Sequence, residues 1–394
     1  MFRRSPARPR PVAGLWLVFF VNGAVLSSWA PRIPEVRAQL CLSDAALGAA
    51  LFGVAAGSVP TLLVAGRWIR RVGGRTVCLL SAPALVLALP LLSGASDAPS
   101  LGLILALLGA ASGALDVAMN STALEFQRRR GATPILSRLH GGYSLGVLVG
   151  ATGGVVAVAA GLSVTAHFAA VTGVLLILLT AAAPHLPDVA PPPGPHPAAG
   201  APRPRPLQSL SATIAAIAIA GLLLEGTMTD WSALLVGRDL GAGATVGSGT
   251  VAAFSLAMFA SRSAGDLLVP AMGRARYLVS AGAVAAGGAS AGLLIPGWIA
   301  GYLGAIAVGL VLGPVFPLAI DLAAERAPHA IASAAAAVSA VGYSAYLGGP
   351  PLIGLLAQAL GLPTTVALAG AACGLILVAA ALRCRPRRST PLRS

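Results

Sequence analysis

Charged and polar side chains inside apolar stretches are the positions where this chain could carry out chemistry. Asp116 and Asn120 lie four residues apart near the middle of one such stretch, so a helix would place them on the same face. Glu225 lies near the middle of another stretch, with Asp230 closer to its end. An ionised side chain at the centre of a bilayer costs about 2.5–3.5 kcal/mol on insertion scales, so such residues normally face water or a partner. We therefore interpret them first as functional residues.

Proton transfer is the chemistry that these carboxyl groups predict. A carboxyl group in an apolar cavity can exchange protons near neutral pH. Asp116 and Glu225 are the first candidates for proton coupling, and Asp230 is a further candidate. His140 is another, because an unperturbed imidazole titrates near pH 6.5. A purely structural role, hydrogen bonding between helices, stays open for Asp116 and His140.

The composition indicates a membrane protein. Of the 394 residues, 57% are hydrophobic and only 10% are charged, whereas soluble domains carry about 25% charged residues. The net charge of +14 does not indicate nucleic-acid binding, because the arginines lie between apolar stretches, as they do in short loops. The four cysteines lack the spacing of a zinc site or a disulfide framework, and no metal or cofactor is expected.

Apolar stretches long enough to cross a bilayer as helices, about 20 residues each, recur along the whole chain. The sequence therefore predicts an all-α membrane protein with 12 transmembrane helices. The expected spans are 12–31, 44–66, 76–93, 101–125, 134–160, 162–183, 209–236, 246–268, 276–295, 298–323, 330–357 and 362–382.

Arginine placement predicts how these spans are oriented. An even number of spans puts both termini on one side, and nearly all of the loop arginines fall on that side. Arg32, Arg37 and Arg238 fall on the other. Because Arg-rich loops stay in the cytoplasm, we expect a multi-pass protein of the bacterial inner membrane with both termini cytoplasmic.

A proline-rich segment divides the chain. Residues 184–208 contain ten prolines, a composition typical of extended polyproline structure and not of helix. The predicted domains are an N-terminal six-helix bundle over 1–183, a cytoplasmic linker over 184–208 and a C-terminal six-helix bundle over 209–394.

The two halves also resemble each other in sequence. Gly142-Tyr143-Ser144 matches Gly342-Tyr343-Ser344, and Gly73 matches Gly273, both at an offset of 200 residues. Trp29 and Trp231 pair at an offset of 202. Six-helix halves of this kind have the same orientation and form parallel repeats, so the substrate site is expected at their interface near mid-membrane.

The segment between the second and third spans is similar to a signature of the major facilitator superfamily. The family pattern is Gly-x-x-x-Asp-Arg-x-Gly-Arg-Arg, and the segment here reads Gly66-Arg67-Trp68-Ile69-Arg70-Arg71-Val72-Gly73-Gly74-Arg75. Arg70 replaces the acid that helps to latch the cytoplasmic gate in the family. The resemblance implies a cytoplasmic gate at Gly66, Arg70, Arg71 and Gly73, to which we add Arg262 and Asp266, an i,i+4 pair near the same side.

Further segments resemble a bacterial branch of permeases related to the fucose permease. They are Phe20-Val21-Asn22-Gly23, Ser28-Trp29-Ala30-Pro31-Arg32-Ile33-Pro34, Leu115-Asp116-Val117-Ala118-Met119-Asn120, Ser137-x-x-His140, Glu225-Gly226-Thr227-Met228-Thr229-Asp230-Trp231-Ser232 and Gly313-Pro314-Val315-Phe316-Pro317. From these segments and the intramembrane polar residues we expect the substrate to contact Asn22, Trp29, Asn120, Tyr143, Trp231 and Tyr343.

These features predict a secondary transporter and not an enzyme. It would carry a small polar organic solute, sugar-like or another metabolite, across the lipid bilayer by alternating access, with protons as the coupling ion and as a monomer. The alternative is a proton-driven efflux antiporter of drugs or metabolites, although the antiporter motif is incomplete at Gly146-x-x-x-Gly150-Ala151-Thr152-Gly153-Gly154, which lacks its proline. The identity of the solute, the direction of transport and the choice between protons and sodium stay open.

Overall fold

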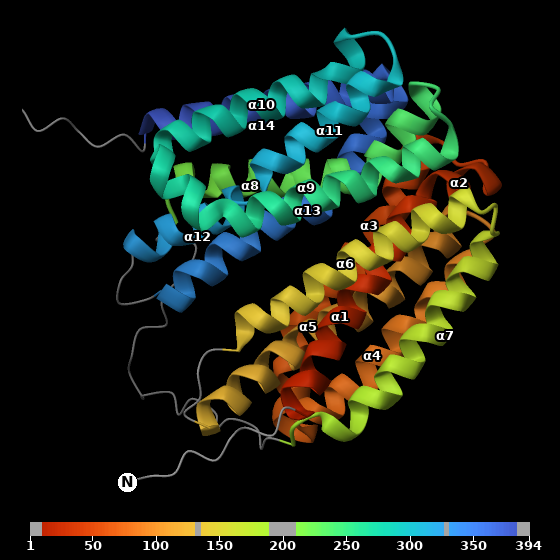
Figure 1. Cartoon of the computed structure of the whole chain (residues 1–394), viewed down its shortest axis with the longest axis vertical. Coiled ribbons are helices and arrows are strands. Elements are labelled where there is room, and N and C mark those ends of the chain that lie inside the picture. Colours follow the sequence, from red (N-terminus) through yellow and green to blue (C-terminus); the bar gives the residue numbers. More distant parts are fainter. Residues whose placement is uncertain (1–9, 131–134, 189–209, 327–330, 384–394) are drawn as a thin grey trace, which may run out of the picture.

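The computed structural model describes residues 10–130, 135–188, 210–326 and 331–383, and every regular element in these ranges is a helix (Figure 1). The α-helices are α1 (Arg10–Trp29), α2 (Ile33–Gln39), α3 (Asp44–Val72), α4 (Gly74–Leu91), α5 (Ala98–Arg130), α6 (Leu136–Ala159), α7 (Val164–Ala182), α8 (Ala212–Leu234), α9 (Gly243–Met272), α10 (Arg274–Leu294), α11 (Trp298–Leu312), α12 (Val315–Arg326), α13 (Ile331–Leu360) and α14 (Leu362–Arg383). Short 3₁₀ segments are η1 (Ala30–Arg32), η2 (Leu92–Gly94) and η3 (Ala183–His185), and η5 (Leu235–Asp239) is a π-helical turn.

The all-helical membrane fold predicted from the sequence is confirmed. In the described ranges, 11 segments are long and apolar enough to cross a membrane. The expected twelfth span corresponds to α13, which has 30 residues but is not among those 11, so the count of twelve stays a prediction. Many large apolar side chains lie exposed on the helices, among them Leu63, Leu103 and Leu267, as expected of a surface that faces lipid.

One expected span is broken in two. The sequence predicts a single helix over 298–323, but α11 ends at Leu312 and α12 begins at Val315. Pro314 lies in the gap, where it lacks an amide hydrogen for the helix ladder and its ring crowds the preceding turn. The apolar pattern runs through such a break without changing, so hydropathy alone does not reveal it.

The helices form two bundles with matching internal contacts. In the first bundle α1 packs on α6, α3 on α5 and α4 on α7; in the second, α8 packs on α13, α9 on α11 and α10 on α14. The bundles converge at the end that carries α2 and diverge toward the opposite end (Figure 1). We call the first end, with residues 33–46 and 235–243, the α2 end, and the other, with the turns at Gly73 and Gly273, the Gly73 end.

The two glycine turns at the Gly73 end have the same conformation, as the repeat predicts. Gly73 between α3 and α4 has φ 84° and ψ 149°, and Gly273 between α9 and α10 has φ 78° and ψ 140°. This region of backbone space is essentially open to glycine alone. The offset of 200 residues therefore corresponds to a turn that is repeated in the two halves of the structure.

Glycines let the helices of each bundle approach closely. A Cβ on Gly57 of α3 would lie 1.8 Å from the carbonyl oxygen of Ala106 in α5, and a Cβ on Gly146 of α6 would lie 2.0 Å from that of Phe20 in α1. Small residues at crossings are the usual way in which helices associate in lipid, where apolar surface alone gives no preference for protein over lipid.

Two glycines of α6 give a matched test of this packing. Gly146→Ala should lower the thermal unfolding temperature of the detergent-purified protein, because the new methyl group meets the Phe20 carbonyl. Gly153→Ala is the control, since no atom lies within 4 Å of a Cβ at that position, and it should be neutral or stabilising by about 0.5–1 kcal/mol. Equal destabilisation by both substitutions would contradict the close α1–α6 crossing.

Candidate substrate site

A cavity of about 230 Å³ lies between the two bundles. Its walls come from α1, α3 and α6 of the first bundle and from α8, α9 and α13 of the second. The sequence repeat predicted a site at this interface. The cavity combines ionisable side chains with hydroxyl groups and aromatic rings.

Two of the predicted carboxyl groups, Glu225 and Asp230, line the cavity from α8. The Thr229 hydroxyl donates to the main-chain carbonyl oxygen of Glu225 at 2.9 Å. This bond holds the Thr229 side chain against its own helix. Within the described part of the chain Asp230 shows no hydrogen-bond partner, and its charge interacts with the Tyr346 hydroxyl. Asp230 therefore keeps its acceptor oxygens for a ligand or for water.

Arg262 of α9 brings a cation to the same cavity. Its Nη2 lies 3.4 Å from Oε2 of Glu225, and its Nε donates to the Gly313 carbonyl oxygen at 3.4 Å. The Arg262 side chain is 47% exposed and that of Glu225 is 22% exposed. Both contacts are long, so the guanidinium retains donors that a solute could use.

The side chain of Asp116 is exposed and lies near groups of both bundles. It lies on α5 outside the cavity lining, and Asn120 Nδ2 donates to its carbonyl oxygen at 2.9 Å and to its Oδ1 at 3.2 Å. Its charge interacts with the hydroxyls of Tyr143 on α6 and Tyr343 on α13. Because these tyrosines belong to different bundles, the carboxylate lies where the bundles face each other.

Aromatic side chains form much of the remaining wall. Trp29 and Tyr143, both predicted as substrate contacts, line the cavity. Tyr343 does not; it is 49% exposed with its ring centroid 5.9 Å from that of Phe316. Tyr346, which the sequence analysis did not single out, takes the place beside Glu225 and Asp230. Its position one helical turn after Tyr343 is the signal that would have found it.

Three other predicted residues lie away from the cavity. Asn22 is 2% exposed and accepts from the Ser112 hydroxyl at 3.2 Å, so it joins α1 to α5. Trp231 is completely buried inside the second bundle. His140 is exposed, with its ring edge-on to that of Phe19 at 5.3 Å. None of the three lines the cavity.

Four of the predicted gate residues, Gly66, Arg70, Arg71 and Gly73, lie at the Gly73 end. Arg70 and Arg71 are exposed at the end of α3, and a Cβ on Gly66 would approach the Arg70 guanidinium at 3.7 Å. Arg262 belongs to the cavity, where it pairs with Glu225; the side chain of Asp266 lies outside the described residues. The gate itself stays a prediction.

Pro350 of α13 also lines the cavity, next to Pro351 in the helix interior.

In the described residues no group of three or more His, Cys, Asp or Glu side chains could hold a metal ion.

Two serines of the second bundle test the position of the cavity. Ser255 lines it, whereas Ser232 is 1% exposed and does not. In a chain with Cys41 and Cys384 replaced by serine, Ser255→Cys should react with a hydrophilic maleimide roughly tenfold faster than Ser232→Cys, because thiol reactivity requires access. Equal rates in the purified protein, measured by mass spectrometry, would contradict the cavity described here.

Comparisons with known proteins agree with this architecture. A sequence model of the Major Facilitator Superfamily matches residues 15–350. An uncharacterised MFS-type transporter of Yersinia pestis is 31% identical over 369 residues, which cover 93% of this chain and 94% of the relative. The membrane protein MosC of Rhizobium meliloti is 30% identical over 360 residues, with 91% of this chain and 86% of the relative covered.

Solved structures show the same fold at low sequence identity. The nucleoside transporter NupG, as its D323A mutant, superimposes with a TM-score of 0.77 at 12% identity and covers 95% of this chain and 100% of its own. An auto-inhibited peptide transporter of the POT family gives a TM-score of 0.72 at 14% identity, covering 98% and 99% of the two chains. Placement in the fucose-permease branch stays a prediction. The chain belongs to the major facilitator superfamily of membrane transporters.

Proposed function

We propose that this protein is a secondary active transporter that carries a small polar organic solute through the central cavity by alternating access, coupled to protons. The observation that supports this most directly is the set of Glu225, Asp230 and Arg262 in a cavity shared by both bundles. An ionisable residue within membrane-spanning helices is by default a candidate for binding a ligand or a proton.

The lining favours a small polar solute. At about 230 Å³ the cavity is smaller than the pockets of roughly 300–1,000 Å³ that hold drug-sized ligands. Ser27, Ser144, Thr229 and Ser255 line it, and hydroxyl groups can hydrogen-bond to hydroxyl, amide or amine groups of a metabolite. Trp29 and Tyr143 add aromatic residues to the lining.

Glu225 and Arg262 supply a route for coupling. In this structure the two side chains are paired, with Nη2 of Arg262 3.4 Å from Oε2 of Glu225. A solute that hydrogen-bonds to Arg262 would compete for its donors and release Glu225 to take up a proton. On our proposed path the next proton acceptors are Asp230, which lies beside Glu225, and Asp116, which lies toward the open Gly73 end.

The relative position of the bundles supports an inward-facing state. Hydrogen bonds between the bundles lie at the α2 end, where Arg238 reaches Asp44 and the Ser248 hydroxyl reaches the Pro31 carbonyl oxygen. If the Arg-rich loops are cytoplasmic, the α2 end faces outward and the diverging Gly73 end opens to the cytoplasm. We take the protein to be a monomer of the bacterial inner membrane with both termini inside.

Binding can be tested before the solute is identified. The purified protein should be screened for thermal stabilisation by a library of sugars, cyclitols, nucleosides and amino acids; a solute at 100 times its Kd stabilises by about 2.7 kcal/mol. The stabilisation should be lost in Glu225→Gln and Arg262→Gln and kept in Asp188→Asn, which changes an exposed carboxylate outside the cavity. Retention of the full shift in both cavity variants would place the binding site elsewhere.

Coupling can be tested with the solute so found. In right-side-out vesicles, addition of solute should drive proton uptake that is abolished by Glu225→Gln or Asp116→Asn and unchanged in Asp188→Asn. A pH-sensitive dye reports the proton movement. Undiminished proton uptake in both carboxyl variants, together with normal solute uptake, would exclude these carboxyl groups from coupling.

A further inference from the structure

A second hollow, of about 210 Å³, lies between α4 and α7 of the first bundle, and we call it the α4–α7 slot. Its lining includes Cys78, Leu79 and Ala82 of α4 and Leu176, Leu179 and Thr180 of α7. Cys78 and Ala82 are buried at its floor, whereas Leu79 and Thr180 are exposed at its mouth. Both helices are long and apolar enough to span a membrane, so the slot opens sideways toward lipid. It shares no lining residue with the substrate cavity.

The chemistry of the slot suits hydrocarbon and not water. Apart from Thr180 its lining is made of Ala, Val, Leu, Pro and Cys side chains. The Thr180 hydroxyl donates to the Ile177 carbonyl oxygen of its own helix at 2.8 Å. A water molecule needs polar partners, and apolar hollows therefore stay dry. Because this one opens toward the bilayer, an acyl chain is the occupant that its walls favour.

Hydrogen bonds between α4 and α7 bound the slot along both helices. On the side of the α2 end the Thr172 hydroxyl donates to the Val86 carbonyl oxygen at 3.3 Å. On the side of the Gly73 end Arg75 Nη2 donates to the Ala183 carbonyl oxygen at 3.4 Å. The spacing of the two helices is thus fixed on each side of the slot, which makes it a built feature of the bundle.

Arg75 brings an unbalanced positive charge to the Gly73 end of the slot. Its Nε is buried without a hydrogen-bond partner, and in the ranges that the structure describes it forms no ion pair. Arg75 also lies in the first turn of α4, which has no acidic residue and no side-chain cap from Gly73. The dipole of a helix makes its N-terminus positive as well. Both the guanidinium and the helix end therefore lack an anion.

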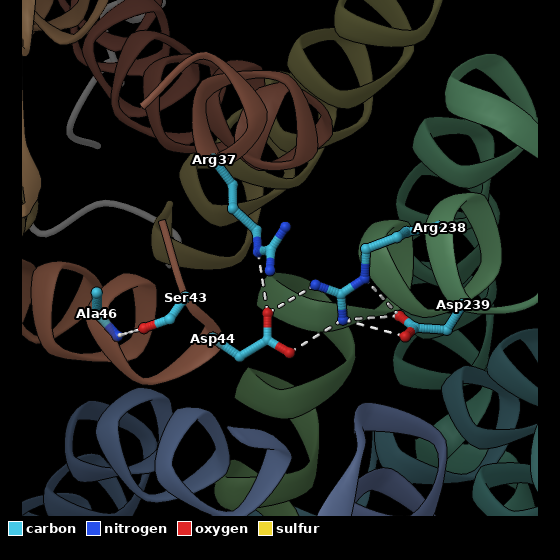
Figure 2. Close-up of polar contacts among 6 residues, drawn as sticks. All are labelled: Arg37, Ser43, Asp44, Ala46, Arg238 and Asp239. Atoms are coloured by element: carbon cyan, nitrogen blue, oxygen red, sulfur yellow. Dashed lines mark hydrogen bonds and ion pairs between the residues drawn. The ribbon is translucent and has the colours of Figure 1, made fainter. Parts of the chain in front are cut away.

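Arginines in comparable places have carboxylate partners. At the α2 end Arg238 donates to Asp44 at 2.7 Å (Figure 2). At the matching glycine turn of the second bundle, Arg274 begins α10 and donates from Nη1 to Oε2 of Glu325 at 2.6 Å. The first bundle places Arg75 beside its own glycine turn without such a carboxylate. An anion from outside the chain would complete this turn in the same way.

We propose that the α4–α7 slot binds a phospholipid of the leaflet at the Gly73 end, with an acyl chain in the slot and the phosphodiester against Arg75 and the first amides of α4. Helix N-termini bind phosphate groups through their free amides, and the forked guanidinium matches phosphate oxygens. Cys78 lies three residues after Arg75, on the same face of α4. The charged and apolar parts of the site thus adjoin as they do in a phospholipid. The inference does not depend on the solute that is transported.

Protection of a thiol at the mouth of the slot tests this proposal. Thr180→Cys is introduced in a chain with Cys41 and Cys384 replaced by serine, purified in detergent and treated with a maleimide, and labelling is measured by mass spectrometry. Phosphatidylglycerol at ten times its Kd should slow labelling roughly tenfold, because only the empty slot reacts. Ile177→Cys is the control: it lies one turn away on α7, is 68% exposed and does not line the slot. Its labelling rate should not change.

Two substitutions should weaken the protection from opposite ends of the site. Arg75→Gln should raise the lipid concentration for half protection roughly tenfold, the effect of losing one hydrogen bond to a charged group. Arg276→Gln is its control, because Arg276 is an exposed arginine in the first turn of α10. Ala82→Leu narrows the slot from its floor and should weaken protection with Arg75 intact. It also carries the test if Arg75→Gln fails to fold.

The headgroup and the chain are separated by two further ligands. Dioleoylglycerol, which lacks the phosphate, should protect Thr180→Cys no better than phosphatidylglycerol protects the Arg75→Gln variant, and inorganic phosphate should not protect it. Full protection by dioleoylglycerol would overturn the phosphate contact, and protection by inorganic phosphate would overturn the lipid. Equal slowing at Thr180→Cys and Ile177→Cys would also overturn the proposal, because lipid would then coat the surface without selecting the slot. So would unchanged protection in both Arg75→Gln and Ala82→Leu.

Discussion

The cost of an ionised group in hydrocarbon is the constraint on which the rest of this molecule depends. It forces Glu225, Asp230 and Arg262 into a space between two bundles, where water, a partner or a solute can reach them. The cavity is thus a direct consequence of where the charges lie in the sequence.

Close backbone approach is the second requirement, and glycine meets it. Gly57 and Gly146 allow helices within one bundle to touch at their carbonyl groups, and Gly48 and Gly354 do the same between bundles. The two uses have different consequences. Contacts within a bundle have to persist through a transport cycle, whereas contacts between bundles at the α2 end have to form and break. Exposed ion pairs suit the second use because water competes with them.

The sequence predicted the helices, the repeat and the placement of Glu225 and Asp230 at the interface. Such predictions succeed because the hydropathy of a segment, and the free-energy cost of a charged side chain within it, can be read from the local sequence. It did not predict which face of a helix turns inward, because most of these helices are apolar all round. Asn22 and Trp231 were therefore assigned to the substrate and instead lie inside the bundles. Arg262–Glu225 and Arg238–Asp44 join residues 37 and 194 positions apart, and no local pattern encodes such pairs.

Pro350 and Pro351 in α13 have an effect on the chemistry of the cavity wall. A proline has no amide hydrogen, so the carbonyl oxygens of Tyr346 and Leu347, four residues earlier, lose their usual helical donors. Both of those residues line the cavity. The helix that borders the cavity therefore carries two carbonyl groups without their usual helical donors, and exchange of the Tyr346 and Leu347 side chains leaves these groups in place.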